Sequence, residues 1–162
     1  MLEALLVIAV VVAVQLYQSR GLPESAAPLL AGSLSNGGST SLAEVLRQAG
    51  GKPVLVAFWA SWCVVCKAEE GNLAAIAHDT PFLGVAIQSG DAAAVALHLK
   101  QRGLDFSSLA DPDNTLAQRW RVRGVPTHFI VDGQGKVRFR VVGYATTLGL
   151  RARLWWAQRF PA

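Results

Sequence analysis

Two cysteines, Cys63 and Cys66, are the residues of this chain whose type and spacing most plainly support chemistry. Residues at positions i and i+3 of a helix lie on one face, close enough for two sulfurs to bond. The segment 67–78 that follows has the pattern of a helix, so one thiol stands at a helix amino end. Free backbone N–H groups and the helix dipole favour a thiolate there. The pattern therefore predicts thiol–disulfide exchange.

The two sulfurs are expected to divide this work, with Cys63 exposed and Cys66 shielded. The Cys63 thiolate attacks a disulfide of a partner protein, and Cys66 then attacks the mixed disulfide and releases the reduced partner. An inert structural pair and a metal site are the alternatives. The metal site has less support, because zinc takes three or four protein ligands, and the three histidines His78, His98 and His128 are scattered along the chain.

The amino-terminal segment is strongly apolar. The chain has 162 residues, 52% of them hydrophobic, which suggests one domain with a buried core and an appendage. Residues 4–19 carry no charge. As a helix they would span roughly 24 Å, slightly less than the ~30 Å hydrocarbon core of a bilayer. We expect a signal anchor, a transmembrane helix over residues 1–19. A cleaved signal peptide is the alternative, but Gln18-Ser19-Arg20 is a poor cleavage site.

Positive charge is concentrated in the last third of the chain. The net charge is +4, yet nine basic residues from Arg119 onward face Asp132 as their only acidic counterpart. A basic face could approach anionic lipid or an acidic partner. The alternative is a strand with one solvated face, because Lys136, Arg138 and Arg140 alternate with apolar residues. No nucleic-acid motif accompanies these charges, so nucleic acid is not an expected partner.

Further elements must hold the cysteines in place. Residues 20–40 are rich in glycine, serine and proline and predict a flexible tether, with a short strand near Leu34. The folded domain is expected over residues 41–162. It opens with the capping box Ser41-Leu42-Ala43-Glu44, which predicts a helix over 42–49.

Short apolar runs predict the sheet. Val54–Phe58 and Phe82–Ile87 are typical of strands buried on both faces, and the helix between them makes a right-handed βαβ unit. Thr127–Val131 and Val137–Val142 predict a hairpin. The remaining predictions are three helices: 92–102 capped by Asp91, 115–120 capped by Asp113 or Asn114, and 147–158.

This order of elements, with two motifs, resembles the thioredoxin superfamily. The motifs are Phe58-Trp59-Ala60-Ser61-Trp62-Cys63-x-x-Cys66-Lys67 and Gly124-Val125-Pro126-Thr127, and the match covers residues 41–160. The resemblance implies an α/β thioredoxin fold, a central mixed β-sheet flanked by helices. It also implies a cis Val125–Pro126 bond that faces the cysteines, where the Val125 backbone pairs with an extended partner chain. Trp62, Val125 and Pro126 are thus the expected substrate-binding residues, with Trp62 shielding the site.

Within the superfamily, the anchor, the tether and Cys66-Lys67-Ala68-Glu69 look like the membrane-anchored, periplasm-facing oxidoreductases of the TlpA and DsbE type. The stretches 88–91 and 143–150 look most like the suppressor-of-copper-sensitivity D proteins. The cytochrome c maturation reductases carry an acidic residue after the cis-proline, whereas Thr127 and His128 stand here. A dedicated haem-pathway role is therefore less expected.

A proton acceptor for Cys66 must also be found. Thioredoxin proper has a buried aspartate on the strand before the active site, and Ala57 occupies the matching place here. Glu69 lies three residues after Cys66 on the same helix face, and the TlpA-like group has a glutamate there, so we assign proton transfer to Glu69. A solvated surface glutamate is the alternative. His128 either tunes the site or is an ordinary hydrogen-bonded strand histidine.

The dipeptide Val64-Val65 between the cysteines offers neither charge nor hydrogen-bond donor to the thiolate, which predicts a reductant or isomerisation partner and not a primary disulfide donor. We expect a single-pass protein of the bacterial inner membrane whose periplasmic domain reduces disulfides in envelope proteins. A membrane thiol-reducing conduit would re-reduce it, and no cofactor is implied. The alternatives are a dedicated cytochrome c maturation or copper-resistance thiol reductase, and a non-catalytic copper- or peptide-binding module. Met1 is the only methionine, which argues against a copper carrier.

Overall fold

The computed structural model describes residues 6, 9, 10, 13, 14, 17, 20–23 and 25–160. The transmembrane helix predicted over residues 1–19 therefore falls largely outside the described residues. Within the part of the chain that is described, none of the helices combines the length and the apolar character needed to cross a bilayer.

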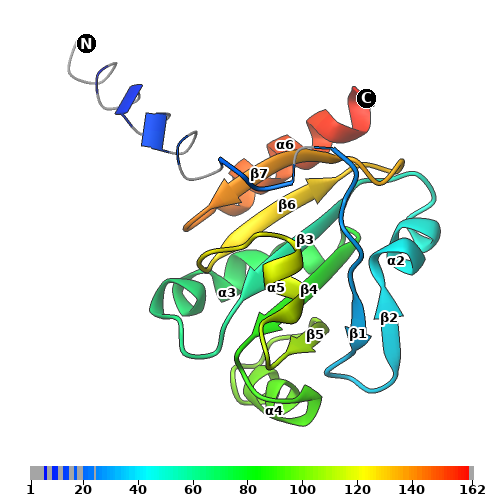
Figure 1. Cartoon of the computed structure of the whole chain (residues 1–162), viewed down its shortest axis with the longest axis vertical. Coiled ribbons are helices and arrows are strands. Elements are labelled where there is room, and N and C mark those ends of the chain that lie inside the picture. The colour runs from blue at the N-terminus through cyan, green and yellow to red at the C-terminus, as the bar shows by residue number, and fades with distance from the viewer. Residues whose placement is uncertain are drawn as a thin grey trace.

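A five-stranded mixed sheet forms the centre of the molecule, in the order β5-β4-β3-β6-β7 (Figure 1). The strands are β3 (Val54–Trp59), β4 (Phe82–Ile87), β5 (Ser108–Asp111), β6 (Thr127–Val131) and β7 (Val137–Val142). β3, β4 and β5 run parallel, whereas β6 pairs antiparallel with both β3 and β7. Every residue of β3 is buried. The mixed α/β architecture predicted from the sequence is confirmed.

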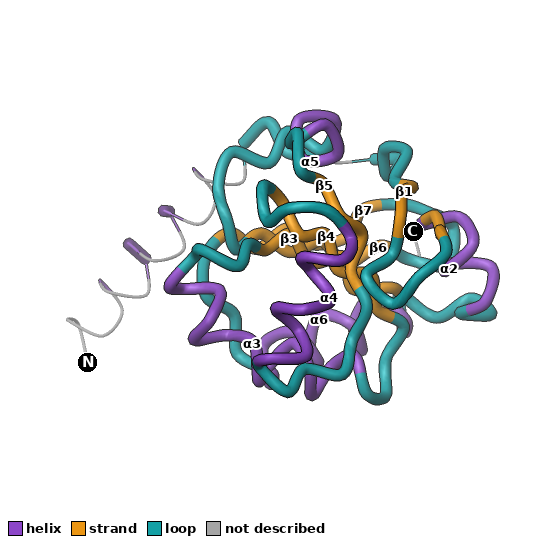
Figure 2. Tube along the Cα trace, turned by 90° about the horizontal axis from the view of Figure 1, so that it is seen from below, coloured by secondary structure: helices purple, strands orange, loops and turns teal. Residues whose placement is uncertain are grey.

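Helices cover both faces of this sheet. Figure 2 shows α3 (Val64–Ala77) and α6 (Thr147–Arg159) on one side and the short α5 (Thr115–Arg119) on the other. Side chains alternate along each strand, so the core has two layers. Leu55 and Ala57 pack toward α3 and α6, whereas the aromatic ring of Phe58 lies with its centroid 5.6 Å from that of Trp120, just after α5.

The helices expected from the sequence are present, including α2 (Leu42–Gln48) and α4 (Ala92–Gln101). Asn114 is the N-cap residue of α5, one of the two positions expected, but its side chain makes no cap hydrogen bond. The carboxylate of Asp111 instead accepts hydrogen bonds from the backbone N–H groups of Leu116 and Ala117, each at 2.9 Å. Asp111 ends β5, a strand that the sequence did not predict, and the strand holds its carboxylate over the helix start.

Residues 25–40 belong to the folded domain, so the predicted flexible tether is wrong for this stretch. β1 (Ala31–Ser33) and β2 (Ser39–Ser41) form an antiparallel hairpin, where a single strand near Leu34 had been expected. Leu30 is only 2% exposed because it packs into the core. Bridges from Ala26 to Lys136 and from Leu34 to Leu109 join this stretch to the central sheet. The domain therefore begins earlier than residue 41.

Candidate active site

The two cysteines lie where β3 passes into α3. Cys63 is the N-cap residue of α3, which begins at Val64 and not at residue 67. Its sulfur accepts a hydrogen bond from the backbone N–H of Cys66 at 3.1 Å. This confirms a cysteine sulfur at the amino end of a helix, where the helix dipole and unpaired N–H groups stabilise negative charge.

Cys63 and Cys66 are joined in a disulfide, with their Cα atoms 5.2 Å apart. Cys66 is 1% exposed, as expected for the shielded sulfur. Cys63 is only 7% exposed, so the prediction of an exposed Cys63 is wrong for the disulfide form. Its sulfur is covered because it lies 3.6 Å from the backbone carbonyl oxygen of Val125. Cys63 nevertheless remains the more accessible of the two.

The loop that covers Cys63 contains a cis peptide bond between Val125 and Pro126. Hydrogen bonds hold both sides of the loop. The N–H of Gly143 donates to the carbonyl oxygen of Pro126 at 2.8 Å, and the hydroxyl of Thr127 donates to the carbonyl oxygen of Gly124 at 2.8 Å. The cis-proline loop thus faces the cysteines, as the resemblance to thioredoxin implies.

An apolar rim surrounds the disulfide. Trp62 is 56% exposed, and its indole N–H donates to the carbonyl oxygen of Gln88 at 3.1 Å, which fixes the ring beside the cysteines. Val64 and Val65 between the cysteines are also exposed. Trp59 differs from Trp62 because it is buried in the core, where its indole N–H donates to the hydroxyl of Ser108 at 2.9 Å.

Glu69 and His128 form a buried pair on the α3 side of the sheet. Both side chains are fully buried, so Glu69 is not the solvated surface glutamate of the alternative interpretation. Glu69 Oε1 accepts the N–H of Ala145 at 3.0 Å and lies 2.9 Å from His128 Nε2. That second contact lacks hydrogen-bond alignment. Glu69 Oε2 and both ring nitrogens of His128 have no hydrogen-bond partner among the described residues.

The register of the sheet explains why His128 reaches Glu69. His128 on β6 is directly opposite Ala57 on β3, so the two side chains leave the same face of the sheet. Ala57 is the position at which thioredoxin proper has its buried aspartate. Sequence reasoning left the role of His128 open, because strand pairing across 71 positions is not visible in the sequence. The one signal in the sequence was the small Ala57 in place of the aspartate, because it leaves room for a proton-handling group from another element.

The histidines occupy three separate places. His98 Nε2 lies 3.1 Å from a carboxylate oxygen of Glu70, whose other oxygen accepts from Arg102 Nε at 2.8 Å, and this cluster ties α3 to α4. His78 is the C-cap of α3, whereas His128 contacts Glu69. Across the described residues, no group of three or more histidine, cysteine or carboxylate side chains is arranged to hold a metal ion.

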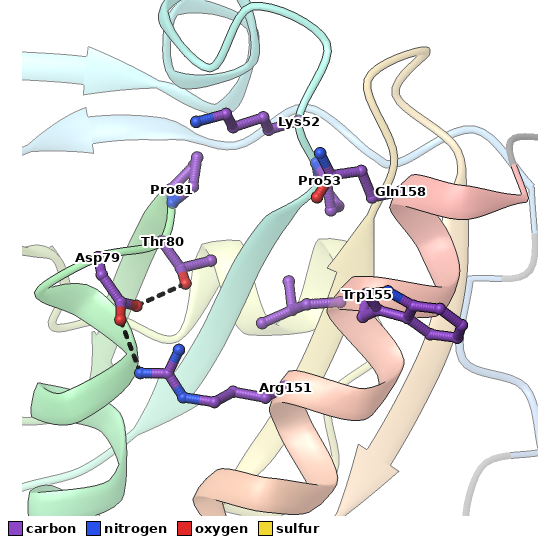
Figure 3. A pocket seen from close by; sticks show the side chains of 9 residues that line it. Lys52, Pro53, Asp79, Thr80, Pro81, Arg151, Trp155 and Gln158 are labelled. Atoms are coloured by element: carbon purple, nitrogen blue, oxygen red, sulfur yellow. Dashed lines mark hydrogen bonds and ion pairs between the residues drawn. The ribbon is translucent and has the colours of Figure 1, made fainter.

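A pocket drawn in Figure 3 lies away from the cysteines. It includes Pro53, which precedes β3, whereas Cys63 follows the far end of that strand. Arg151 of α6 donates to Asp79 at 2.8 Å at its edge. Hydrogen bonds from Arg151 and Thr80 lower the pKa of the Asp79 carboxyl. The pocket thus lies at the opposite end of β3 from the exchange site.

Residues 23–140 match the AhpC/TSA family. The chain is 41% identical over 101 residues to a thiol:disulfide interchange protein DsbE homolog of Paracoccus denitrificans, covering 62% of this chain and 55% of that protein. It is 31% identical over 124 residues to a thioredoxin-like protein of Haemophilus influenzae, covering 76% of this chain and 72% of the relative. The chain thus spans little more than half the length of the Paracoccus relative.

A solved structure shares the fold. The secreted Mycobacterium tuberculosis disulfide oxidoreductase homologous to E. coli DsbE superimposes with a TM-score of 0.62 at 23% identity, covering 82% of this chain and 94% of that one.

Proposed function

The chain belongs to the AhpC/TSA family, and we propose that it acts there as a thiol–disulfide oxidoreductase that reduces disulfides in partner proteins through Cys63 and Cys66. One observation carries this proposal: the redox pair caps a helix, and its outer sulfur lies 3.6 Å from the carbonyl oxygen of Val125 in the cis-proline loop. The names of the Paracoccus and Haemophilus relatives support it.

The first step uses Cys63. In the dithiol form its sulfur loses a proton, and the N–H of Cys66 with the amino end of α3 stabilises the thiolate. The partner lies extended beside the cis-proline loop, where its backbone pairs with Val125 and its apolar side chains contact Trp62. The thiolate attacks one partner sulfur and displaces the other as a thiolate, which leaves a mixed disulfide.

The second step uses Cys66 and Glu69. The buried carboxylate of Glu69, one helical turn from Cys66, accepts the Cys66 thiol proton. The Cys66 thiolate then attacks Cys63, so the bond between the two cysteines forms while the bond to the partner breaks. The partner leaves with two added electrons, and the enzyme is left as the disulfide.

The proposed direction is reduction, in the periplasm. Val64 and Val65 give the Cys63 thiolate no charge or donor, so the dithiol form is not especially favoured and gives up its electrons readily. The apolar segment 1–19 supports an inner-membrane anchor. A membrane thiol-reducing conduit would return the disulfide to the dithiol, and disulfide-containing envelope proteins would be the substrates. If the likeness of stretches 88–91 and 143–150 to the suppressor-of-copper-sensitivity D proteins extends to function, one of these substrates would be a protein involved in copper resistance.

A reductase with one dedicated client is the second candidate. The 41% identity to the DsbE homolog favours it, and cytochrome c maturation or copper resistance would supply the client. Thr127 and His128 after the cis-proline, in place of an acidic residue, weigh against the cytochrome c client.

The test is turnover with trapping. The chain should catalyse insulin reduction by dithiothreitol, and Cys66→Ser should accumulate covalent partners that Cys63→Ser does not. The matched pair separates the attacking sulfur from the resolving one. Retention of Cu(I) at fixed stoichiometry, with no turnover and no trapped partner, would identify a metal-binding module and reject the proposed function.

A further inference from the structure

The Glu69–His128 pair leaves more polar atoms unsatisfied than an ordinary core does. Both side chains are 0% exposed, and three of their four polar atoms lack a hydrogen-bond partner among the described residues. Buried polar atoms in native proteins are nearly always paired, because leaving one unpaired is costly. Because these polar atoms of Glu69 and His128 are unpaired while the cysteines form a disulfide, they point to a role in the dithiol form.

Among the described residues, Glu69 is the ionisable side chain that the structure places in direct contact with His128. From α3 it is faced by Glu69, at 2.9 Å, and Cys66 lies one turn earlier on that helix. The strand neighbours in register are Ala57 on β3 and Val141 on β7, neither of which titrates. Glu69 is thus the group through which His128 can influence the chemistry of Cys66.

We propose that His128 is a positioning residue that keeps Glu69 ionised and oriented for the Cys66 step. His128 Nε2 already lies 2.9 Å from Glu69 Oε1, and the terminal torsion of the imidazole is soft, so a small rotation of the ring would bring Nε2–H into line with Oε1. Oε1 then has two donors, the ring and the N–H of Ala145. Oε2 has none, and stays available to the Cys66 thiol.

This assignment rests on the proposed function and supplies what its second step needs. A fully buried carboxyl group resists ionisation unless donors or opposite charge stabilise the anion. With His128 donating, Glu69 holds its charge and takes the proton from Cys66. The electron pair left on the Cys66 sulfur forms the bond to Cys63, and the partner sulfur departs with the electrons of the broken bond. His128 itself gains and loses no proton in the step.

The test follows the resolution step as pH changes. Reduced full chain is mixed with glutathione disulfide, quenched with acid at successive times, and the Cys63–glutathione mixed disulfide is quantified by mass spectrometry. In the unmodified chain, the rate of its resolution should rise with pH, because the Cys66 thiol must lose its proton before its sulfur attacks Cys63. His128→Leu removes the donor that stabilises the Glu69 carboxylate, so the rising limb of this rate should move upward by about 1–3 pH units.

Conservative and control variants separate positioning from packing. His128→Gln keeps an amide donor and should leave the limb near its original pH. Ile130→Val trims a buried residue two positions along the same strand face and should lower stability without moving the limb. In Glu69→Gln the limb disappears, and adding His128→Leu should change nothing further. Two results overturn the proposal. One is a rate limb that stays in place in His128→Leu. The other is a limb that persists in Glu69→Gln and is still moved when His128→Leu is added.

A readout without turnover distinguishes failure of this inference from failure of the proposed function. If the mixed disulfide never resolves in the unmodified chain, the reductase proposal fails. The ¹⁵N resonances of the His128 ring still test the pairing in the reduced chain, and they require no variant at His128. A proton on Nε2 that is lost in Glu69→Gln supports the contact, whereas a proton on Nδ1 alone in the unmodified chain overturns it.

Discussion

The reactivity proposed for Cys63 rests on a backbone contact at the start of α3. Its sulfur accepts the N–H of Cys66 at 3.1 Å, so a thiolate there has a donor already in place, in addition to the field of α3. The neighbouring side chains of Val64 and Val65 point to solvent and add no polar group. We therefore expect the backbone N–H of Cys66 and the start of α3 to set the balance between dithiol and disulfide. A polar side chain placed at Val64 or Val65 should then shift it.

Replacing Val65 with histidine should make the protein more oxidising. An imidazole beside the Cys63 thiolate stabilises the dithiol form, and a tenfold change in equilibrium corresponds to about 30 mV for this two-electron couple. We expect Val65→His to raise the reduction potential by at least about that amount. Equilibration with glutathione buffers and mass spectrometry of the alkylated forms measures it.

Val65→Leu is the matched control, because it changes size without adding a charge or donor, and its potential should stay close to the original. If the unmodified chain is itself strongly oxidising, the assignment as a reductant is rejected.

At the scale of elements, the long apolar strands were predictable and the short polar ones were not. The runs Phe82–Ile87, Thr127–Val131 and Val137–Val142 match β4, β6 and β7 residue for residue, because continuous burial or hairpin alternation is written in the sequence. β5 and the β1–β2 hairpin are short and contain serine and glycine. Their strand conformation comes from neighbours in space and not from an apolar pattern.

In the candidate active site, the residues that carry local motifs were predictable, and the contacts between residues far apart in the sequence were not. Cys63, Cys66 and the cis-proline loop carry local motifs, so the sequence placed them. The Glu69–His128 contact joins residues 59 positions apart and depends on the β3–β6 register, which no local pattern reveals. The reduced exposure of Cys63 has the same origin, since its cover comes from Val125.

The cap of α5 gives a prediction at this scale. Asp111→Ala removes the acceptor for two backbone N–H groups in a buried setting, so we expect a loss of about 1–2 kcal/mol in the free energy of unfolding. Urea denaturation followed by circular dichroism measures it. Asp113→Ala, which changes an exposed neighbour, should cost little. Equal losses in the two variants would contradict the assignment of Asp111 as the cap.

At the scale of the whole molecule, the stretch before residue 41 completes the core. Leu30 packs in the same cluster of buried residues as Phe58 and Trp120. Backbone hydrogen bonds continue this attachment, since Val137 donates to the carbonyl oxygen of Ser25 at 2.8 Å. The domain therefore needs this stretch for its stability.

Leu30→Ala should destabilise the domain by about 2–5 kcal/mol, as expected for a buried leucine whose removal leaves a cavity. Leu29→Ala is the matched control, because Leu29 is 79% exposed and its loss should have little effect. Thermal unfolding of both variants checks the difference. If Leu30→Ala is as stable as the control, residues 25–40 do not contribute to the core.

Residues 25–40 also cover the outer strands of the sheet, which limits pairing with the strands of other protein molecules. On one side of the sheet, Leu34 and Ser35 pair with the outer side of β5. On the other side, Ser25 and Ala26 pair with Val137 and Lys136 at the start of β7. Farther along β7 the outer strand carries the charged residues Arg138 and Arg140. Open strand edges invite self-polymerisation, and covering or charging them prevents it. With both outer strands covered or charged, the Val125 backbone beside Cys63 is left as the place where an extended chain can pair, which would keep the contact with a partner of the proposed reductase short and reversible.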